Sequence, residues 1–100
     1  MIISFKTTRM EREYKDERKA AKSYGEQIAR KYIQRVNLLK QARNLDEVKA
    51  LPGLNCHPLK GNRKGQWAVK LTGFYRLIFT VTGTALNFAR IEEVSKHYDD

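Results

Sequence analysis

The C-terminal half of the chain alternates between apolar and polar residues, and this alternation restricts it to short β-strands. Over residues 66–72, Trp67, Val69 and Leu71 fall on one side, where we expect the core, and polar or small residues fall on the other. A period of two is typical of a strand that buries one face. Glycine-containing turns separate this strand from its neighbours. We therefore predict four strands, over about residues 56–60, 66–72, 74–81 and 85–91.

The N-terminal half has the apolar spacing of helices instead. A short β-prone segment, Ile2–Phe5, comes first and is predicted to be a strand. Thr8 and Glu11 have the spacing of a capping box, which predicts the start of a helix. Gly25 weakens helix propensity and predicts a break, after which a second helix spans about residues 26–43.

These elements give the order β-α-α-β-β-β-β, with a short helical turn before the last four strands. Separation of the helices from a run of hairpin-linked strands indicates an α+β domain with a mainly antiparallel, twisted sheet. The second helix has an apolar stripe of Ile28, Tyr32, Val36 and Leu39, so we expect the N-terminal helices to cover one face of the sheet. The length fits a single domain over residues 1–100. The other face of the sheet is then left open.

The charge of the strand region is of one sign. The chain has 20 Lys and Arg against 11 Asp and Glu, a net charge of +9, and no acidic residue occurs between Glu47 and Glu92. We therefore expect an acid-free, basic open face, which suits a polyanion because each neutralised phosphate releases counterions. An ordinary basic surface, an acidic membrane or an acidic protein partner fits the same charge. The candidates for RNA contact are Arg63, Lys64, Lys70 and Arg90.

Several other functions lack the residues that they need. His57 and His97 are far apart in the sequence and Cys56 is the only cysteine, so we predict no metal site and no bound cofactor. We expect Cys56 to be a small buried hydrophobe rather than a nucleophile. The segment Gly61–Gly65 lacks the spacing of a nucleotide-binding loop. No apolar stretch is long enough to span a membrane and no signal peptide is evident, so we expect a cytoplasmic protein.

Cleavage of RNA by its own 2′-hydroxyl, without a metal ion, matches the residues that remain. That reaction needs a base for the hydroxyl proton, cations for the charge that develops on phosphorus, and an acid for the leaving 5′-oxygen. Histidine suits either proton role because its pKa lies near working pH. Lys60 and Arg76 suit the charge, since a guanidinium can grip two phosphate oxygens. By strand alternation Arg76 lies opposite Leu77 and Phe79, which places it on the open face.

A resemblance to a known family rests on two segments of the strand region. Residues 57–67 read HPLKGNRKGQW, and residues 73–79 read GFYRLIF. They resemble the H-x-L-K-G-[D/N]-R-x-G-x-W and [Y/W]-R-[L/I]-x-F patterns of HigB-like toxins of the RelE/ParE superfamily. The resemblance implies the toxin of a type II toxin–antitoxin system, a ribosome-dependent endoribonuclease that cuts messenger RNA in the A site of the 70S ribosome and inhibits translation. It also implies a cognate DNA-binding antitoxin that binds and blocks the toxin.

The resemblance implies catalytic roles for individual residues as well. The His and Lys of the first segment match His57 and Lys60, and the Arg of the second segment matches Arg76. The family's last strand often ends in V-E-I-x-D-Y-H, whose final residues act in cleavage. This chain reads IEEVSKHY there, which implies catalytic roles for His97 and, one position later than usual, for Tyr98. Serine and lysine precede His97 where aspartate and tyrosine are usual in the family.

Two other functions stay open from the sequence. One is a toxin like those of the ParE branch, which does not cut RNA and poisons DNA gyrase by protein contacts; titratable groups such as His57 and His97 argue against it. The other is a non-catalytic RNA-binding module, in which His57 and Lys60 only solvate a strand edge. Such a module would bind RNA with a steep salt dependence and would tolerate the loss of either histidine.

Overall fold

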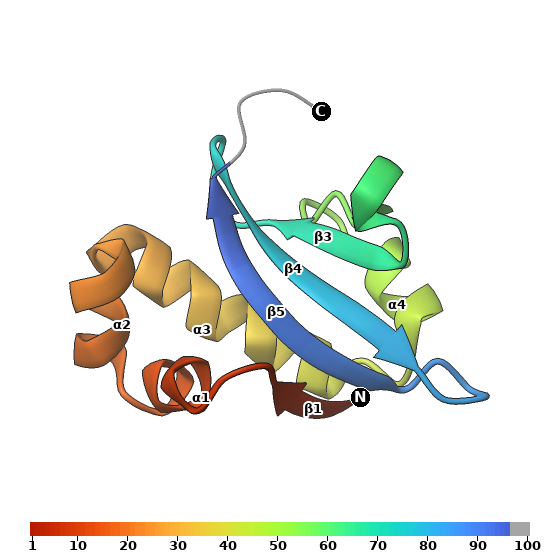
Figure 1. Cartoon of the computed structure of the whole chain (residues 1–100), viewed down its shortest axis with the longest axis horizontal. Coiled ribbons are helices and arrows are strands. Elements are labelled where there is room, and N and C mark those ends of the chain that lie inside the picture. Colours follow the sequence, from red (N-terminus) through yellow and green to blue (C-terminus); the bar gives the residue numbers. More distant parts are fainter. Residues whose placement is uncertain (97–100) are drawn as a thin grey trace.

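The computed structural model describes residues 1–96, in which helices cover one face of a five-stranded sheet (Figure 1). The α+β class predicted from the sequence is confirmed. The strands are β1 (Ile2–Phe5), β2 (His57–Pro58), β3 (Gln66–Lys70), β4 (Tyr75–Thr82) and β5 (Phe88–Lys96). The helices are α1 (Thr8–Lys15), α2 (Glu17–Tyr24), α3 (Glu26–Gln41) and α4 (Leu45–Ala50), and a 3-10 helix, η1, covers Gly61–Arg63.

The sheet brings the first and last strands of the chain side by side. Its strand order is β1-β5-β4-β3-β2, in which β1 pairs with β5 in parallel and the other neighbours pair antiparallel. The prediction of a mainly antiparallel sheet is therefore confirmed. Within this register Lys70 lies opposite Arg76, and Arg76 lies opposite Ser95. One row of residues thus crosses β3, β4 and β5 on the same face.

The core lies between α3 and the helix-covered face of the sheet. Tyr32, Val36 and Leu39, from the predicted stripe of α3, are completely buried, as are Leu77 and Phe79 of β4. All of these belong to one apolar cluster, and Figure 1 shows α1, α2 and α3 along one side of β4 and β5. The alternation of residues therefore correctly predicted which sides of β3 and β4 face the helices. No helix in residues 1–96 combines the length and apolar character needed to cross a membrane.

The beginning of the helical layer differs from the prediction in two ways. Thr7, not Thr8, caps α1, because its hydroxyl accepts a hydrogen bond from the Met10 amide at 3.1 Å. The single helix predicted before residue 25 is divided into α1 and α2 at Asp16. The Asp16 backbone is extended (φ −140°, ψ 103°), and its carboxylate accepts a hydrogen bond from the Arg18 amide at 3.0 Å. An aspartate in this position ends one helix and caps the next.

The helix break predicted at Gly25 is confirmed, and a capping side chain begins α4. Gly25 separates α2 from α3 and has φ 84°, a left-handed conformation that glycine adopts without steric cost. Asn44 caps α4, since its side chain accepts a hydrogen bond from the Glu47 amide at 3.1 Å.

The strand boundaries differ most at β5. We predicted a last strand over residues 85–91, but β5 starts at Phe88 and continues to Lys96. Residues 83–86 form a turn, in which the Leu86 amide donates to the Gly83 carbonyl at 3.0 Å and Leu86 has φ 51°. A branched apolar residue rarely adopts that conformation, so the sequence did not show that the turn predicted at Gly83 continues to Leu86. β2 is also shorter than predicted and consists of residues 57–58 only.

Candidate active site

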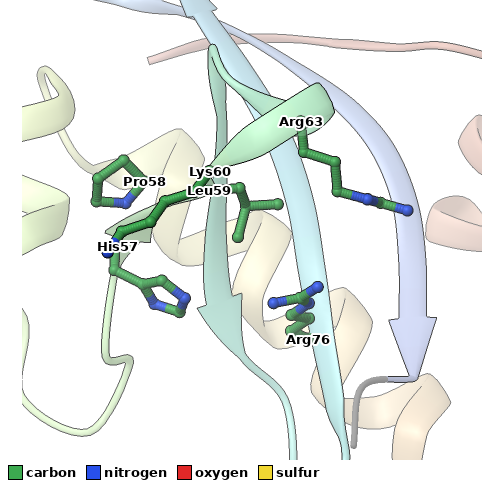
Figure 2. Close-up of a pocket in the computed structure, with 6 residues that line it drawn as sticks. All are labelled: His57, Pro58, Leu59, Lys60, Arg63 and Arg76. Atoms are coloured by element: carbon green, nitrogen blue, oxygen red, sulfur yellow. The ribbon is translucent and has the colours of Figure 1, made fainter. Parts of the chain in front are cut away.

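The open face of the sheet, opposite the helices, has a pocket beside β3 (Figure 2). Leu59, which lines this pocket, packs with Ala68 and Ile78 in a small apolar cluster that is separate from the main core. β2 pairs with β3 and β3 pairs with β4, so the segment after residue 56 is brought over the middle of β4. The pocket has a volume of about 390 Å³ and is lined by His57, Pro58, Leu59, Lys60, Arg63 and Arg76.

The His57 side chain has a defined tautomer. Its Nδ1 lies 2.8 Å from the Asn55 carbonyl oxygen. A carbonyl only accepts hydrogen bonds, so Nδ1 carries the proton and donates it. In the neutral ring, Nε2 then holds the lone pair. The imidazole is therefore oriented to receive a proton at Nε2.

Three of the pocket-lining residues are cationic. Lys60 directly precedes η1, Arg63 ends η1, and Arg76 comes from β4. In Figure 2 the His57 ring and the Arg76 guanidinium lie on either side of β3, with the Arg63 guanidinium on the Arg76 side. Lys70 extends the positive charge along the sheet, because it is exposed and lies opposite Arg76 in the register. This arrangement can hold a phosphate near an imidazole.

The expectation of an acid-free open face is wrong, because β5 brings two carboxylates onto it. The β4–β5 register shifts between Ile78 and Phe79, so two consecutive residues, Glu92 and Glu93, both reach this face. Glu93 forms an ion pair with Arg63 of 2.6 Å between Oε1 and Nη1. Glu92 is 7% exposed and forms an ion pair of 2.6 Å with Arg90. The predicted last strand ended at residue 91, so both glutamates lay beyond the predicted sheet, and the bulge that brings both to one face has no mark in the sequence.

The structure thus brings four of the predicted site residues into one pocket, namely His57, Lys60, Arg63 and Arg76. Lys64 is exposed beside this pocket at the end of η1. Arg90 does not line it, and lies instead on β5 opposite Thr80. The predicted catalytic residues His97 and Tyr98 lie outside the described residues. Glu93, which holds Arg63, is a site residue that the sequence analysis missed.

Within residues 1–96, no three side chains of His, Cys, Asp or Glu are grouped so that they could bind a metal ion. The pocket itself has three cationic side chains, Lys60, Arg63 and Arg76, that can neutralise charge on a bound phosphate.

Cys56 precedes the site but lacks the environment of a nucleophile. The residue is half-buried and packs against the main core, and burial raises the pKa of its thiol from 9.0 to about 11. Because the thiolate is the reactive form, at pH 8 we expect iodoacetamide to alkylate Cys56 about a hundredfold more slowly in the folded protein than in urea. Mass spectrometry of the alkylated protein over time measures both rates. Equal rates in the two conditions would contradict this assignment.

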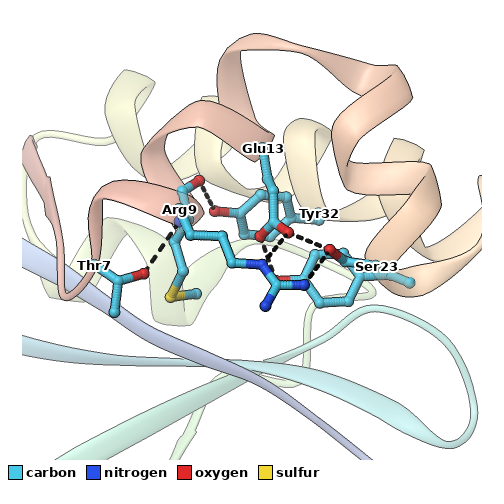
Figure 3. A network of polar contacts seen from close by, with 7 residues as sticks. Thr7, Arg9, Glu13, Ser23 and Tyr32 are labelled. Carbon is cyan, nitrogen blue, oxygen red and sulfur yellow. Dashed lines mark hydrogen bonds and ion pairs between the residues drawn. The ribbon is translucent and has the colours of Figure 1, made fainter.

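A second polar cluster lies in the helical layer and is not part of the site (Figure 3). Glu13 of α1 is 3% exposed, and its carboxylate accepts hydrogen bonds from Arg9, Ser23 and Tyr24. The bond from the Tyr24 hydroxyl is 2.8 Å long, and burial together with this bond raises the pKa of Tyr24. Close by, the Tyr32 hydroxyl donates to the Met10 carbonyl at 2.8 Å. Glu13 therefore ties α1 to the end of α2.

We expect the substitution Glu13→Ala to lower the free energy of unfolding by about 1–3 kcal/mol, because it removes the acceptor of two hydroxyl groups that stay partly buried. Urea denaturation followed by circular dichroism measures this change. Glu11→Ala is the matched control, since Glu11 is exposed in the same helix and its ion pair with Lys15 is exposed as well. It should change the stability by less than about 0.5 kcal/mol. Equal effects of the two substitutions would contradict the role of the Glu13 cluster.

Comparison with known proteins gives one family and a group of solved structures. The model of a family described as the RelE-like toxin of type II toxin–antitoxin system HigB matches residues 3–91. A YoeB/ParE toxin from Agrobacterium tumefaciens is 17% identical, with a TM-score of 0.64 over 98% of this chain and 100% of that chain. No curated protein matches the chain in sequence.

Two solved toxin–antitoxin complexes have the same fold. A chain of the YoeB–YefM complex from Staphylococcus aureus is 19% identical and has a TM-score of 0.61, with 98% of each chain covered. A chain of the E. coli DinJ–YafQ toxin–antitoxin complex is 21% identical and has a TM-score of 0.60, with 95% of this chain and 90% of that chain covered. At these identities the likeness shows a common fold.

Proposed function

Because the chain belongs to the HigB family of RelE-like toxins of type II toxin–antitoxin systems, we propose that it is a ribosome-dependent endoribonuclease that cuts messenger RNA and inhibits translation. The observation that supports this activity best is the pocket on the open face, which combines one oriented imidazole with three cationic side chains. Gyrase poisoning by protein contacts requires no such combination, and a module that only binds RNA requires no oriented imidazole.

The proposed reaction is attack by the 2′-hydroxyl oxygen of the RNA on the adjacent phosphorus. The bond from phosphorus to the 5′-oxygen breaks, which leaves a 2′,3′-cyclic phosphate and a 5′-hydroxyl. Nε2 of His57 holds the lone pair that can receive the 2′-hydroxyl proton. His97 and Tyr98 are the candidates for the group that protonates the leaving 5′-oxygen, as the resemblance of the last strand implies.

Arg76 and Lys60 carry the electrostatic part of the proposed reaction. The transition state places extra negative charge on the phosphoryl oxygens, and a fixed guanidinium stabilises that charge without reorganisation. Arg63 is held by Glu93 at 2.6 Å and so has a fixed position at the edge of the pocket. Lys64 and Lys70 extend the positive surface for neighbouring phosphates, and Arg90 continues it along β5. We propose that these cations replace a metal ion in the reaction.

The proposed partners follow from the charge and from the related complexes. A small sheet offers few contacts to fix a flexible RNA, so the 70S ribosome would position the message in its A site. A cognate, DNA-binding antitoxin would bind the toxin with an acidic segment, because the chain has a net charge of +9. YoeB and YafQ were each solved in complex with a partner, YefM and DinJ. The ribosome places the activity in the cytoplasm.

Mapping of cut sites in cells tests this function. Primer extension on an abundant message, after expression of the protein, should show discrete cuts at a fixed position within codons. The cuts should disappear with Arg76→Ala. Intact message together with DNA damage would instead indicate gyrase poisoning. Intact message and undamaged DNA in cells that keep translating would overturn both toxin activities.

A further inference from the structure

Phe74 lies beside the proposed active site with its ring in solvent. Of the large hydrophobic side chains in residues 1–96 it is the most exposed, at 65%. The turn that carries it is fixed, because the Tyr75 carbonyl accepts hydrogen bonds from the Leu71 amide at 2.9 Å and the Thr72 amide at 3.1 Å. Single exposed apolar residues are common on protein surfaces. Phe74 differs from such residues because it lies next to the cations of the proposed active site.

β3 and β4 each bring a cation to the open face of the sheet, at the end where Phe74 lies. Arg76 follows Phe74 by two residues on β4, and Lys70 of β3 is its partner in the register. Tyr75, the first residue of β4, packs against the helix-covered core, whereas Phe74 before it is exposed to solvent and Arg76 after it lines the pocket on the open face.

An exposed aromatic ring among cations is the arrangement that binds single-stranded nucleic acid. The cations follow the phosphates, and the ring stacks on a base. A phosphate grip by Arg76 alone fixes the backbone but carries no information about the bases. We propose that Phe74 stacks on the base of a nucleotide next to the cut and so positions the RNA at Arg76. This role rests on the proposed endoribonuclease function. Because purines offer the larger stacking surface, it also predicts a purine preference at that nucleotide.

The test uses the purified protein with ribosomes that carry a defined message. Stacking on one base contributes about 5- to 150-fold to binding, so we expect Phe74→Ala and Phe74→Leu to lower the cleavage rate at limiting protein by about tenfold or more. Phe74→Trp should keep the rate within about threefold, since it retains an aromatic face. Leu86→Ala is the control. It truncates an exposed apolar residue (42%) in the turn at the other end of β4 and should leave the rate unchanged.

An abasic nucleotide separates stacking from other contacts of the ring. Removal of the stacked base should slow the wild-type protein and should not slow Phe74→Ala any further. A loss in Phe74→Leu that stays the same with an abasic nucleotide at every position near the cut would show that the ring contacts protein, which overturns stacking. Unchanged cleavage by Phe74→Leu overturns it too, while the endoribonuclease function stands. No cleavage by the wild type would overturn that function and this role together.

Discussion

We expect the substitution Arg76→Ala to lower the rate of message cleavage by about 100- to 1,000-fold. Enzymes usually lose this much when they lose one hydrogen-bond donor that stabilises negative charge in the transition state. Arg76 lines the pocket with His57 and Lys60, so its guanidinium lies where a phosphate would bind beside the imidazole. Single-turnover cleavage of a message on purified ribosomes measures the effect. Arg76→Lys keeps a point charge but loses the planar fork, and we expect an intermediate loss of roughly tenfold.

Arg12→Ala is the matched control for this substitution. Arg12 is an exposed arginine of α1, in the layer that covers the other face of the sheet. Its removal changes the net charge by the same amount, so any general effect of charge on ribosome binding appears in both variants. Equal losses for Arg12→Ala and Arg76→Ala would contradict a local role for Arg76. Thermal unfolding of each variant shows whether the fold is retained.

The largest effect on stability is expected for Phe79→Ala, at about 3–5 kcal/mol. Phe79 is completely buried in the main cluster, and its register partners are Trp67 of β3 and Ile91 of β5. Truncation leaves a cavity between the sheet and α3 that the surrounding backbone cannot fill. Small domains have a total stability of about 5–15 kcal/mol, so this loss would leave the variant marginally folded at best. Urea denaturation measures the change, because the midpoint and the slope of the unfolding transition together give the free energy of unfolding.

Phe74→Ala is the control for the stability measurement. It removes the same ring from a position that is 65% exposed, so its effect should be less than about 0.5 kcal/mol. If Phe79→Ala and Phe74→Ala destabilised the protein to a similar degree, the assignment of the core to the helix-covered face would be wrong. The same control shows that Phe74 variants are folded when their cleavage is measured.

The parts of the fold that could be predicted from the sequence are those in which apolar residues recur with the period of a helix or a strand. The apolar stripe of α3 with Tyr32 and the alternation around Phe79 predicted that these two apolar faces pack together. Each pattern places its apolar residues on a single face of the helix or strand. Features that depend on one residue, such as a helix cap or a turn, were harder to predict. Asp16 fits a solvated helix as well as a cap, and Leu86 has a left-handed conformation that its side chain does not favour. Because the turn continues to Leu86, β5 starts at Phe88, three residues later than predicted.

The candidate site could be predicted in part for a similar reason. His57, Lys60 and Arg76 lie in segments whose strand pairing follows from short turns, so their approach in space was expected and they do line one pocket. The β-bulge after Ile78 has no mark in the sequence, and therefore the pairing of Glu93 with Arg63 was missed. Phe74 was read only as part of a strand. Its exposure depends on how the turn ends, which alternation alone does not determine.

The chemistry at the cut ends of the message tests the proposed reaction most directly. Purified protein and ribosomes with a defined message should give fragments with a 2′,3′-cyclic phosphate on one side of the cut and a 5′-hydroxyl on the other, as identified by mass spectrometry. A 2′-deoxy nucleotide before the cut should abolish cleavage, since it removes the attacking oxygen. Fragments with a 5′-phosphate, or continued cleavage of the 2′-deoxy message, would contradict attack by the RNA's own hydroxyl.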